Sequence, residues 1–346
     1  MVNQVAYELK KEPVAATHAC QLESLEFMCK PANPRIHSST DRWCVWPDCY
    51  VSLPLLISLR LPALWKLLVW EFQPLNREHK NEETHTIKTM SLPTPLIGIL
   101  GGMGPQAGLD MAEKLIAMTR AKCDQDHLPF VLFSLPECIS DRTDFLLGKT
   151  DTNPAQAIAE QLEKMADIGV TIAVMACNTA HARPVFDVAL EILWEKKVEL
   201  QVLHLIDETI AHIKNRHPQA RRVGLLATQG TYKTRLYDQA LEAEGLQCVI
   251  PEEQVRINDI HAALYDPSFG IKTCDGPATA QAVARVRAAI EHVIQLGAEG
   301  VILGCTELPL AVKEDRIGGI PILDPAKIMA EKLVMEISPA KLVRTS

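Results

Sequence analysis

The sequence of 346 residues lacks the features of several classes of protein. It has no basic excess: 35 lysines and arginines face 43 aspartates and glutamates, and a net charge of −8 argues against nucleic acid as the main partner. Ten cysteines are too few for a disulfide-stapled scaffold and favour a reducing, cytoplasmic location. With 47% hydrophobic and 23% charged residues the composition is neither disordered nor fibrous. The composition is therefore that of a globular protein, and the chain is long enough for two domains.

Glycine is absent from the first 90 residues, although the chain has 17. We interpret residues 1–91 as an N-terminal extension that is poorly ordered or lies upstream of a functional start at Met90; a transit or anchoring segment and a folded accessory domain are the alternatives. Val51–Phe72 is apolar and about as long as a membrane span. Arg60, Lys66 and two prolines interrupt it, so we expect no membrane association.

Short apolar runs alternate with amphipathic stretches in the rest of the chain. The predicted strands are 96–100, 130–134, 171–176, 201–205, 222–227, 299–304 and 320–323. The periodic stretches 154–168 and 277–296 are predicted helices. Apolar strands that alternate with helices form parallel sheets covered on both faces, so the fold class is α/β.

An internal repeat divides this region. LIGILGGMG (96–104) aligns with RVGLLATQG (222–230), and DIGVTIAVMACNTAH (167–181) aligns with QLGAEGVILGCTELP (295–309). The repeat predicts two pseudo-symmetric, duplicated lobes, each a mostly parallel sheet flanked by helices.

The first lobe is expected to comprise residues 92–208 and 320–346, and the second residues 209–319. Cys177 and Cys305 each end a strand at matching repeat positions. Because ligands bind beyond the carboxyl ends of parallel strands, we expect both thiols to face an active site in the cleft between the lobes. A helix that begins at each cysteine would lower its thiol pKa.

Two opposed thiols suit inversion of a stereocentre, in which one thiolate removes a proton from carbon and the opposite thiol returns one. Without pyridoxal phosphate, backbone N–H groups and polar side chains must stabilise the developing negative charge. The alternatives are buried structural cysteines, an inter-lobe disulfide and a metal pair. Two cysteines without histidines or acids in register are too few ligands, so no metal is expected.

The turn GGMGPQAG (101–108) fits a dinucleotide fingerprint loosely, but the acidic residue about 20 positions further on is missing. We interpret it as a carboxylate-binding strand-to-helix turn, with Pro105 at the first helical position.

GGMGP (101–105), CNTAH (177–181) and GCTEL (304–308) together resemble the aspartate/glutamate racemase superfamily, from about Leu96 to Ile337. The likeness is closest to aspartate racemases. It implies that no cofactor is used, that Cys177 and Cys305 are the catalytic pair, and that the protein is a homodimer.

The resemblance also assigns the residues that hold the substrate's α-carboxylate. They would be Asn178 and Thr179 after the first cysteine, Thr306 after the second, and the turn at Met103 and Gly104.

Arg142, in Ser-Asp-Arg-Thr, and Lys272 would bind a side-chain carboxylate, and their alternative is a role as solvated loop charges. Asp141 is expected to position Arg142. His181 and Glu307 either orient a thiol or form structural hydrogen bonds. The small-molecule substrate is then an acidic amino acid, aspartate first. A glutamate or broad-specificity racemase, or a non-catalytic dicarboxylate sensor, are the alternatives.

We expect the natural protein to begin near Met90, because every later feature of the fold follows that residue. N-terminal sequencing of the natural protein checks this, and a mature chain that begins near Met1 contradicts it.

Overall fold

The computed structural model describes residues 94–274 and 276–343, which lie in one compact unit of the chain, Glu83–Ser346. The expectations for residues 1–91, including the apolar segment Val51–Phe72, lie outside the described residues. Within the described residues, no helix combines the length and the apolar character needed to cross a membrane.

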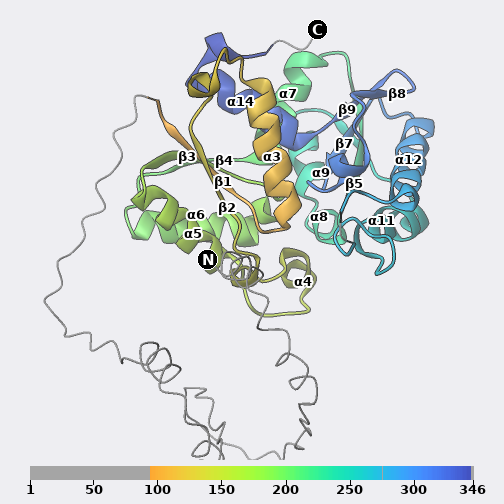
Figure 1. Cartoon of the computed structure of the whole chain (residues 1–346). Coiled ribbons are helices and arrows are strands. Elements are labelled where there is room, and N and C mark those ends of the chain that lie inside the picture. Colours follow the sequence, from red (N-terminus) through yellow and green to blue (C-terminus); the bar gives the residue numbers. More distant parts are fainter. Residues whose placement is uncertain (1–93, 275, 344–346) are drawn as a thin grey trace, which may run out of the picture. The chain divides into compact units, whose positions relative to one another are not determined.

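The first sheet has four parallel strands in the order β2-β1-β3-β4 (Figure 1). They are β1 (Leu96–Leu100), β2 (Phe130–Phe133), β3 (Val170–Met175) and β4 (Gln201–Leu203). Side chains of a strand alternate between its two faces, and both faces of this sheet are covered. Ile97 and Ile99 of β1 pack against one helical layer and Leu100 against the other, which explains why the run is apolar throughout.

The helices α3 (Pro105–Met118) and α14 (Pro325–Ile337) lie side by side on one face of this sheet (Figure 1). The helices α5 (Ala155–Asp167) and α6 (Arg183–Glu195) cover the other face. A short helix, α4 (Arg142–Leu147), lies between β2 and α5 in the chain. We call this sheet and its helices the first lobe.

The second sheet has the order β6-β5-β7-β9-β8. Its strands are β5 (Arg222–Ala227), β6 (Gln247–Val249), β7 (Gly300–Gly304), β8 (Arg316–Ile317) and β9 (Ile320–Leu323). All pairs are parallel except that of β8 with β9. β6 and β8 are too short to give a periodic signal, and the sequence did not predict them.

The second lobe consists of this sheet and its helices. Its helices are α7 (Leu205–Arg216), α8 (Gln229–Lys233), α9 (Leu236–Ala243), α10 (Glu253–Val255), α11 (Ala262–Tyr265), α12 (Ala280–Gln295) and α13 (Leu308–Ala311). α7 and α9 pack on one face of the sheet, and α11 and α12 pack on the other. The predicted α/β fold with two mostly parallel sheets is therefore present.

Two segments differ from the expected lobe boundaries. Residues 320–323 form β9, which pairs with β7, so they belong to the second sheet and not to the first lobe. α7 begins at Leu205, and its Ile206 and Ile210 pack on the second sheet. Strand pairing and the packing of single apolar side chains set these boundaries, and the sequence repeat does not predict either.

The repeated glycines Gly98 and Gly224 have a packing role. A Cβ at Gly98 would lie 2.8 Å from Val170 Cγ1, and one at Gly224 would lie 2.9 Å from Val293 Cγ2. In each lobe the glycine lets the strand lie close to its neighbours, which explains why the repeat keeps glycine at this position.

Candidate active site

A small cavity lies where the chain leaves the carboxyl ends of β3 and β7. It contains about 10 Å³ of free volume, the space of about one water molecule. Ten of the twelve predicted site residues line it, from both lobes: Met103, Asp141, Arg142, Cys177, Asn178, Thr179, Lys272, Cys305, Thr306 and Glu307. Gly104 and His181 do not line it but contact residues that do.

Cys177 follows β3 by two residues and is buried. Its Sγ lies 3.2 Å from Oγ1 of Thr179. Thr179–His181 form a single 3₁₀ turn, η5, and α6 begins only at Arg183. The expectation that a helix begins at Cys177 is therefore wrong, and the helix-dipole argument for its thiol does not apply.

His181 is wholly buried, and burial, aided by His204, lowers its pKa to about 3. The imidazole is thus neutral at physiological pH, and its Nδ1 donates to the carbonyl oxygen of Cys177 at 2.8 Å. Its contact with Cys177 is therefore through the backbone and not through the thiol.

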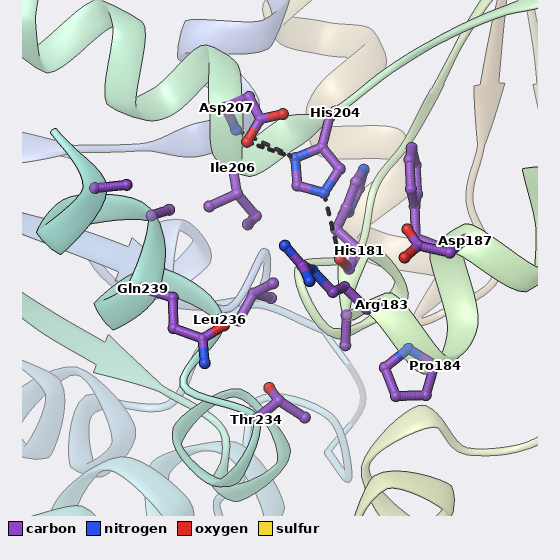
Figure 2. A pocket seen from close by; sticks show the side chains of 14 residues that line it. His181, Arg183, Pro184, Asp187, His204, Ile206, Asp207, Thr234, Leu236 and Gln239 are labelled. Carbon is purple, nitrogen blue, oxygen red and sulfur yellow. Dashed lines mark hydrogen bonds and ion pairs between the residues drawn. The ribbon is translucent and has the colours of Figure 1, made fainter.

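His204 contacts the backbone of His181 (Figure 2). Its Nε2 lies 3.3 Å from the carbonyl oxygen of His181, and its Nδ1 lies 3.3 Å from the backbone nitrogen of Asp207. These residues line a larger pocket of about 710 Å³, which contains neither Cys177 nor Cys305. Because the thiols are elsewhere, we assign the chemistry to the small cavity.

Cys305 directly follows β7 and is also buried. Its thiol donates a hydrogen bond to Oε2 of Glu307 at 3.0 Å. Burial first, and then the Glu307 carboxylate, raise the thiol pKa well above its ordinary value, although Lys272 opposes the shift. The sequence predicted a lowered pKa at a helix start, which is wrong here because α13 begins only at Leu308 and has four residues.

The Glu307 carboxylate connects both sides of the cleft. Its Oε1 accepts the backbone N–H of Gly104 at 3.2 Å and pairs with the Lys272 ammonium. Burial raises the Glu307 pKa. The Lys272 charge and the hydrogen bonds from Lys272, Cys305 and Gly104 outweigh burial, so the pKa lies below its ordinary value. The group is therefore an ionised carboxylate among donors.

The Gly104 N–H at this turn binds a carboxylate of the protein itself, that of Glu307. Its predicted role with the substrate's α-carboxylate stays a prediction. A Cβ at Gly104 would lie 3.1 Å from Oε1 of Glu307, so glycine permits this approach. Pro105 begins α3 in the expected position.

Two further hydrogen bonds cross between the lobes beside the cysteines. Thr306 Oγ1 donates to the carbonyl oxygen of Ala176 at 3.0 Å, and the Tyr237 hydroxyl donates to Oδ1 of Asn178 at 2.6 Å. The proton of the Thr306 hydroxyl is thus used in a hydrogen bond to the backbone of the first lobe.

Arg142 begins α4 and is only 8% exposed. Asp141 caps that helix by accepting the N–H of Asp144 at 2.8 Å, so it positions Arg142 through the backbone. The guanidinium donates to the carbonyl oxygens of Met103 (2.7 Å) and Ser140 (3.0 Å), and its Nε has no partner among the described residues. Burial lowers the Arg142 pKa, but Cys177 and Asp141 raise it further, so it remains a cation.

Three residues of this region were missed at the sequence level. Thr228 lines the cavity and is the repeat counterpart of Gly102, so the alignment itself contained a signal. Thr143 lines the cavity and packs against Gly230 of the second lobe. A Cβ at Gly230 would lie 3.2 Å from the Cα of Thr143. Tyr237 had no local signal, because only folding brings it to Asn178.

The described cysteines are all free thiols, so no disulfide joins the two cysteines of the cleft. Nor do the described histidine, cysteine, aspartate and glutamate side chains form any group of three placed to hold a metal ion.

Comparisons with known proteins relate the chain to amino-acid racemases. The chain is 27% identical over 246 residues to the broad specificity amino-acid racemase RacX of Bacillus subtilis, covering 69% of this chain and 96% of that protein. Among solved structures, the aspartate racemase of Picrophilus torridus is 29% identical with a TM-score of 0.56, and the match covers 70% of this chain and 94% of that one.

An aspartate racemase homologue from Pyrococcus horikoshii is 26% identical with a TM-score of 0.50, and the match covers 69% of this chain and 97% of that one. The model of the family Asp/Glu/hydantoin racemase matches residues 100–333, which include every predicted site residue. The chain therefore belongs to the Asp/Glu/hydantoin racemase family.

Proposed function

We propose that the chain interconverts L- and D-aspartate by a two-cysteine mechanism that needs no cofactor. The observation that carries the proposal is the juxtaposition of Cys177 and Cys305, from equivalent positions of the two lobes, in the wall of one cavity with Arg142 and Lys272.

The mechanism follows from the different surroundings of the two thiols. Cys305 is held in its protonated form, with its proton directed at Glu307, so it is the proton donor of the resting site. Cys177 as thiolate then removes the Cα proton, and Cys305 delivers a proton to the opposite face. After inversion Cys177 holds the proton and Cys305 is the thiolate, which is the state that processes the other enantiomer.

Removal of the Cα proton moves negative charge onto the α-carboxylate. N–H donors that are already in place stabilise that charge without reorganisation. We assign this task to Asn178 and Thr179 in the cavity wall and to the Gly104 N–H, which in the closed form holds a carboxylate oxygen of Glu307.

Charge in the cavity supports an acidic substrate. Arg142 hydrogen-bonds only to main-chain carbonyls among the described residues, so its charge is available to an anion. Lys272 supplies a second cation once the substrate competes with Glu307. A guanidinium and an ammonium fix a short dicarboxylate and disfavour neutral side chains. The homodimer implied by the resemblance and the cytoplasmic location favoured by the cysteine content also stay predictions.

A broad-specificity racemase is the second candidate, because the Bacillus subtilis relative has that activity in its name. A glutamate racemase and a non-catalytic dicarboxylate sensor are further alternatives. The sensor predicts dicarboxylate binding that survives loss of both cysteines and no Cα proton exchange in the wild type.

Replacing either cysteine separates proton exchange from inversion. We expect Cys177→Ala and Cys305→Ala each to lower racemisation by about 10²–10⁴-fold, because one of the two proton-transfer groups is lost. Each variant still exchanges the α-proton of one enantiomer through the remaining thiol. Polarimetry with ¹H NMR in D₂O measures both. Cys248→Ala, a half-buried thiol that does not line the cavity, is the control. Full racemisation by either site variant would refute the two-base assignment.

Arg142→Met tests the acidic substrate. We expect kcat/KM for aspartate to fall by about 10²-fold, because hydrogen bonds to a charged group are lost, while the value for alanine changes little. Steady-state kinetics with both amino acids give the ratio. An equal loss for both would show that Arg142 only maintains the fold, and wild-type kinetics that favour alanine would support the broad-specificity candidate.

Glu307→Gln should shift the pH dependence of Cys305. Removing the negative charge stabilises the thiolate, and Lys272 loses its counter-charge, so both effects lower the thiol pKa. In a Cys177→Ala background, alkylation of Cys305 by iodoacetamide should therefore rise at lower pH than with Glu307 present. Thr179→Val, the equivalent position beside Cys177, should leave the Cys305 profile in place. An unchanged or higher pKa in Glu307→Gln would contradict the assigned electrostatics.

A further inference from the structure

Asn178 directly follows a proposed catalytic cysteine, lines the cavity and is 2% exposed. Its Oδ1 accepts the Tyr237 hydroxyl at 2.6 Å. Its Nδ2 is buried and has no hydrogen-bond partner among the described residues. Buried donors are nearly always paired, so this amide N–H is a donor that awaits an acceptor.

The two ends of an asparagine amide have nearly the same shape, and only hydrogen bonds decide which end is the donor. The Tyr237 hydroxyl keeps its proton, because burial raises its pKa far above the ordinary value. A protonated hydroxyl that donates to Oδ1 fixes the oxygen toward Tyr237. The Nδ2 group is then the end left for a ligand in the cavity.

Tyr237 comes from α9 of the second lobe, whereas Asn178 belongs to the first. Tyr237 is 0% exposed and packs in the core beside Ile206, Leu241 and Leu323, so its ring has a fixed position. The orientation of the Asn178 amide therefore depends on how the lobes meet.

We propose that Tyr237 is a positioning residue, which holds the Asn178 amide so that its Nδ2 donates to a substrate carboxylate when the lobes are closed. The inference rests on the proposed function of the cavity. Negative charge grows on the carboxylate when the Cα proton leaves, so a correctly oriented N–H is worth more in the transition state than in the bound substrate. A rotated amide would place an oxygen against that charge.

Tyr237→Phe removes the hydrogen bond and keeps the ring. We expect kcat/KM for aspartate to fall by about 10–100-fold, with kcat reduced as well as KM raised. This is less than the loss of a whole stabilising donor, because the Asn178 amide itself remains. In an Asn178→Ala background the same substitution should change kcat/KM by less than about twofold, since contacts that act through one another are not additive. An equal loss in both backgrounds would overturn the proposal, as would wild-type kinetics for Tyr237→Phe.

Tyr232→Phe is the matched control. Tyr232 is another buried tyrosine of the second lobe, but its hydroxyl contacts only main-chain atoms, the Leu225 oxygen (2.9 Å) and the Ala227 nitrogen (3.0 Å). A merely structural hydroxyl should lower Tm without the kinetic coupling to Asn178, so we expect Tyr232→Phe to retain kcat/KM. A loss of kcat/KM equal to that of Tyr237→Phe would overturn the special role of Tyr237.

Asn178→Asp keeps an acceptor for Tyr237 and replaces the Nδ2 donor by oxygen. We expect a loss of kcat/KM at least as large as that of Tyr237→Phe, and wild-type kinetics would overturn the donor role even if Tyr237→Phe fails to fold.

Calorimetric titration with aspartate separates this inference from the proposed function. If the wild type binds aspartate without turnover, and Tyr237→Phe weakens binding only when Asn178 is present, the racemase proposal fails while the positioning role holds. A wild type that neither binds nor converts aspartate would overturn both.

Discussion

A single buried carboxylate, that of Glu307, determines how the proposed active site is closed. It accepts hydrogen bonds from the Gly104 N–H of the first lobe and from the Cys305 thiol of the second, and it pairs with Lys272 of the second. A buried charge is tolerated only when its partners satisfy it. Two of these partners, the Gly104 N–H and the Lys272 ammonium, are groups that we propose for the substrate's carboxylates. The Glu307 carboxylate therefore occupies donors that a substrate would need in the proposed function.

The two lobes share one fold, but the residues beside their equivalent cysteines differ. Cys177 and Cys305 occupy equivalent repeat positions, but the residue two places on is Thr179 in the first lobe and Glu307 in the second. The Thr179 hydroxyl lies 3.2 Å from the Cys177 thiol, while the Glu307 carboxylate accepts a hydrogen bond from the Cys305 thiol. Duplication thus places two thiols in the wall of one cavity, and divergence at a single position gives them different neighbours. The proposed reaction, which needs one acid and one base in each turnover, benefits from such a difference.

The two lobes are held together by helices and hydrogen bonds that cross between them. α14 follows the second sheet in the chain but packs on the first, and α7 follows the first sheet but packs on the second. The two helices also pack against each other. Beside the cysteines, hydrogen bonds from Thr306 to Ala176 and from Tyr237 to Asn178 cross the same boundary. Because these bonds involve residues adjacent to both thiols, the geometry of the proposed site depends on how the two lobes pack together.

The sequence alone determined the features that depend on local pattern. Apolar runs and amphipathic stretches predicted the α/β class and the strands β1 to β5, β7 and β9, because hydrophobic periodicity is a property of consecutive residues. The repeat also identified both cysteines, and the motifs around them identified most of the cavity wall. Only the tertiary structure decided that β9 joins the second sheet, that no helix begins at either cysteine, and that Glu307 raises the Cys305 pKa. It alone brought Tyr237 to Asn178, across 59 positions of sequence. Such contacts depend on burial and on the packing of two lobes. They join residues far apart in the sequence, so the pattern of a short segment does not predict them.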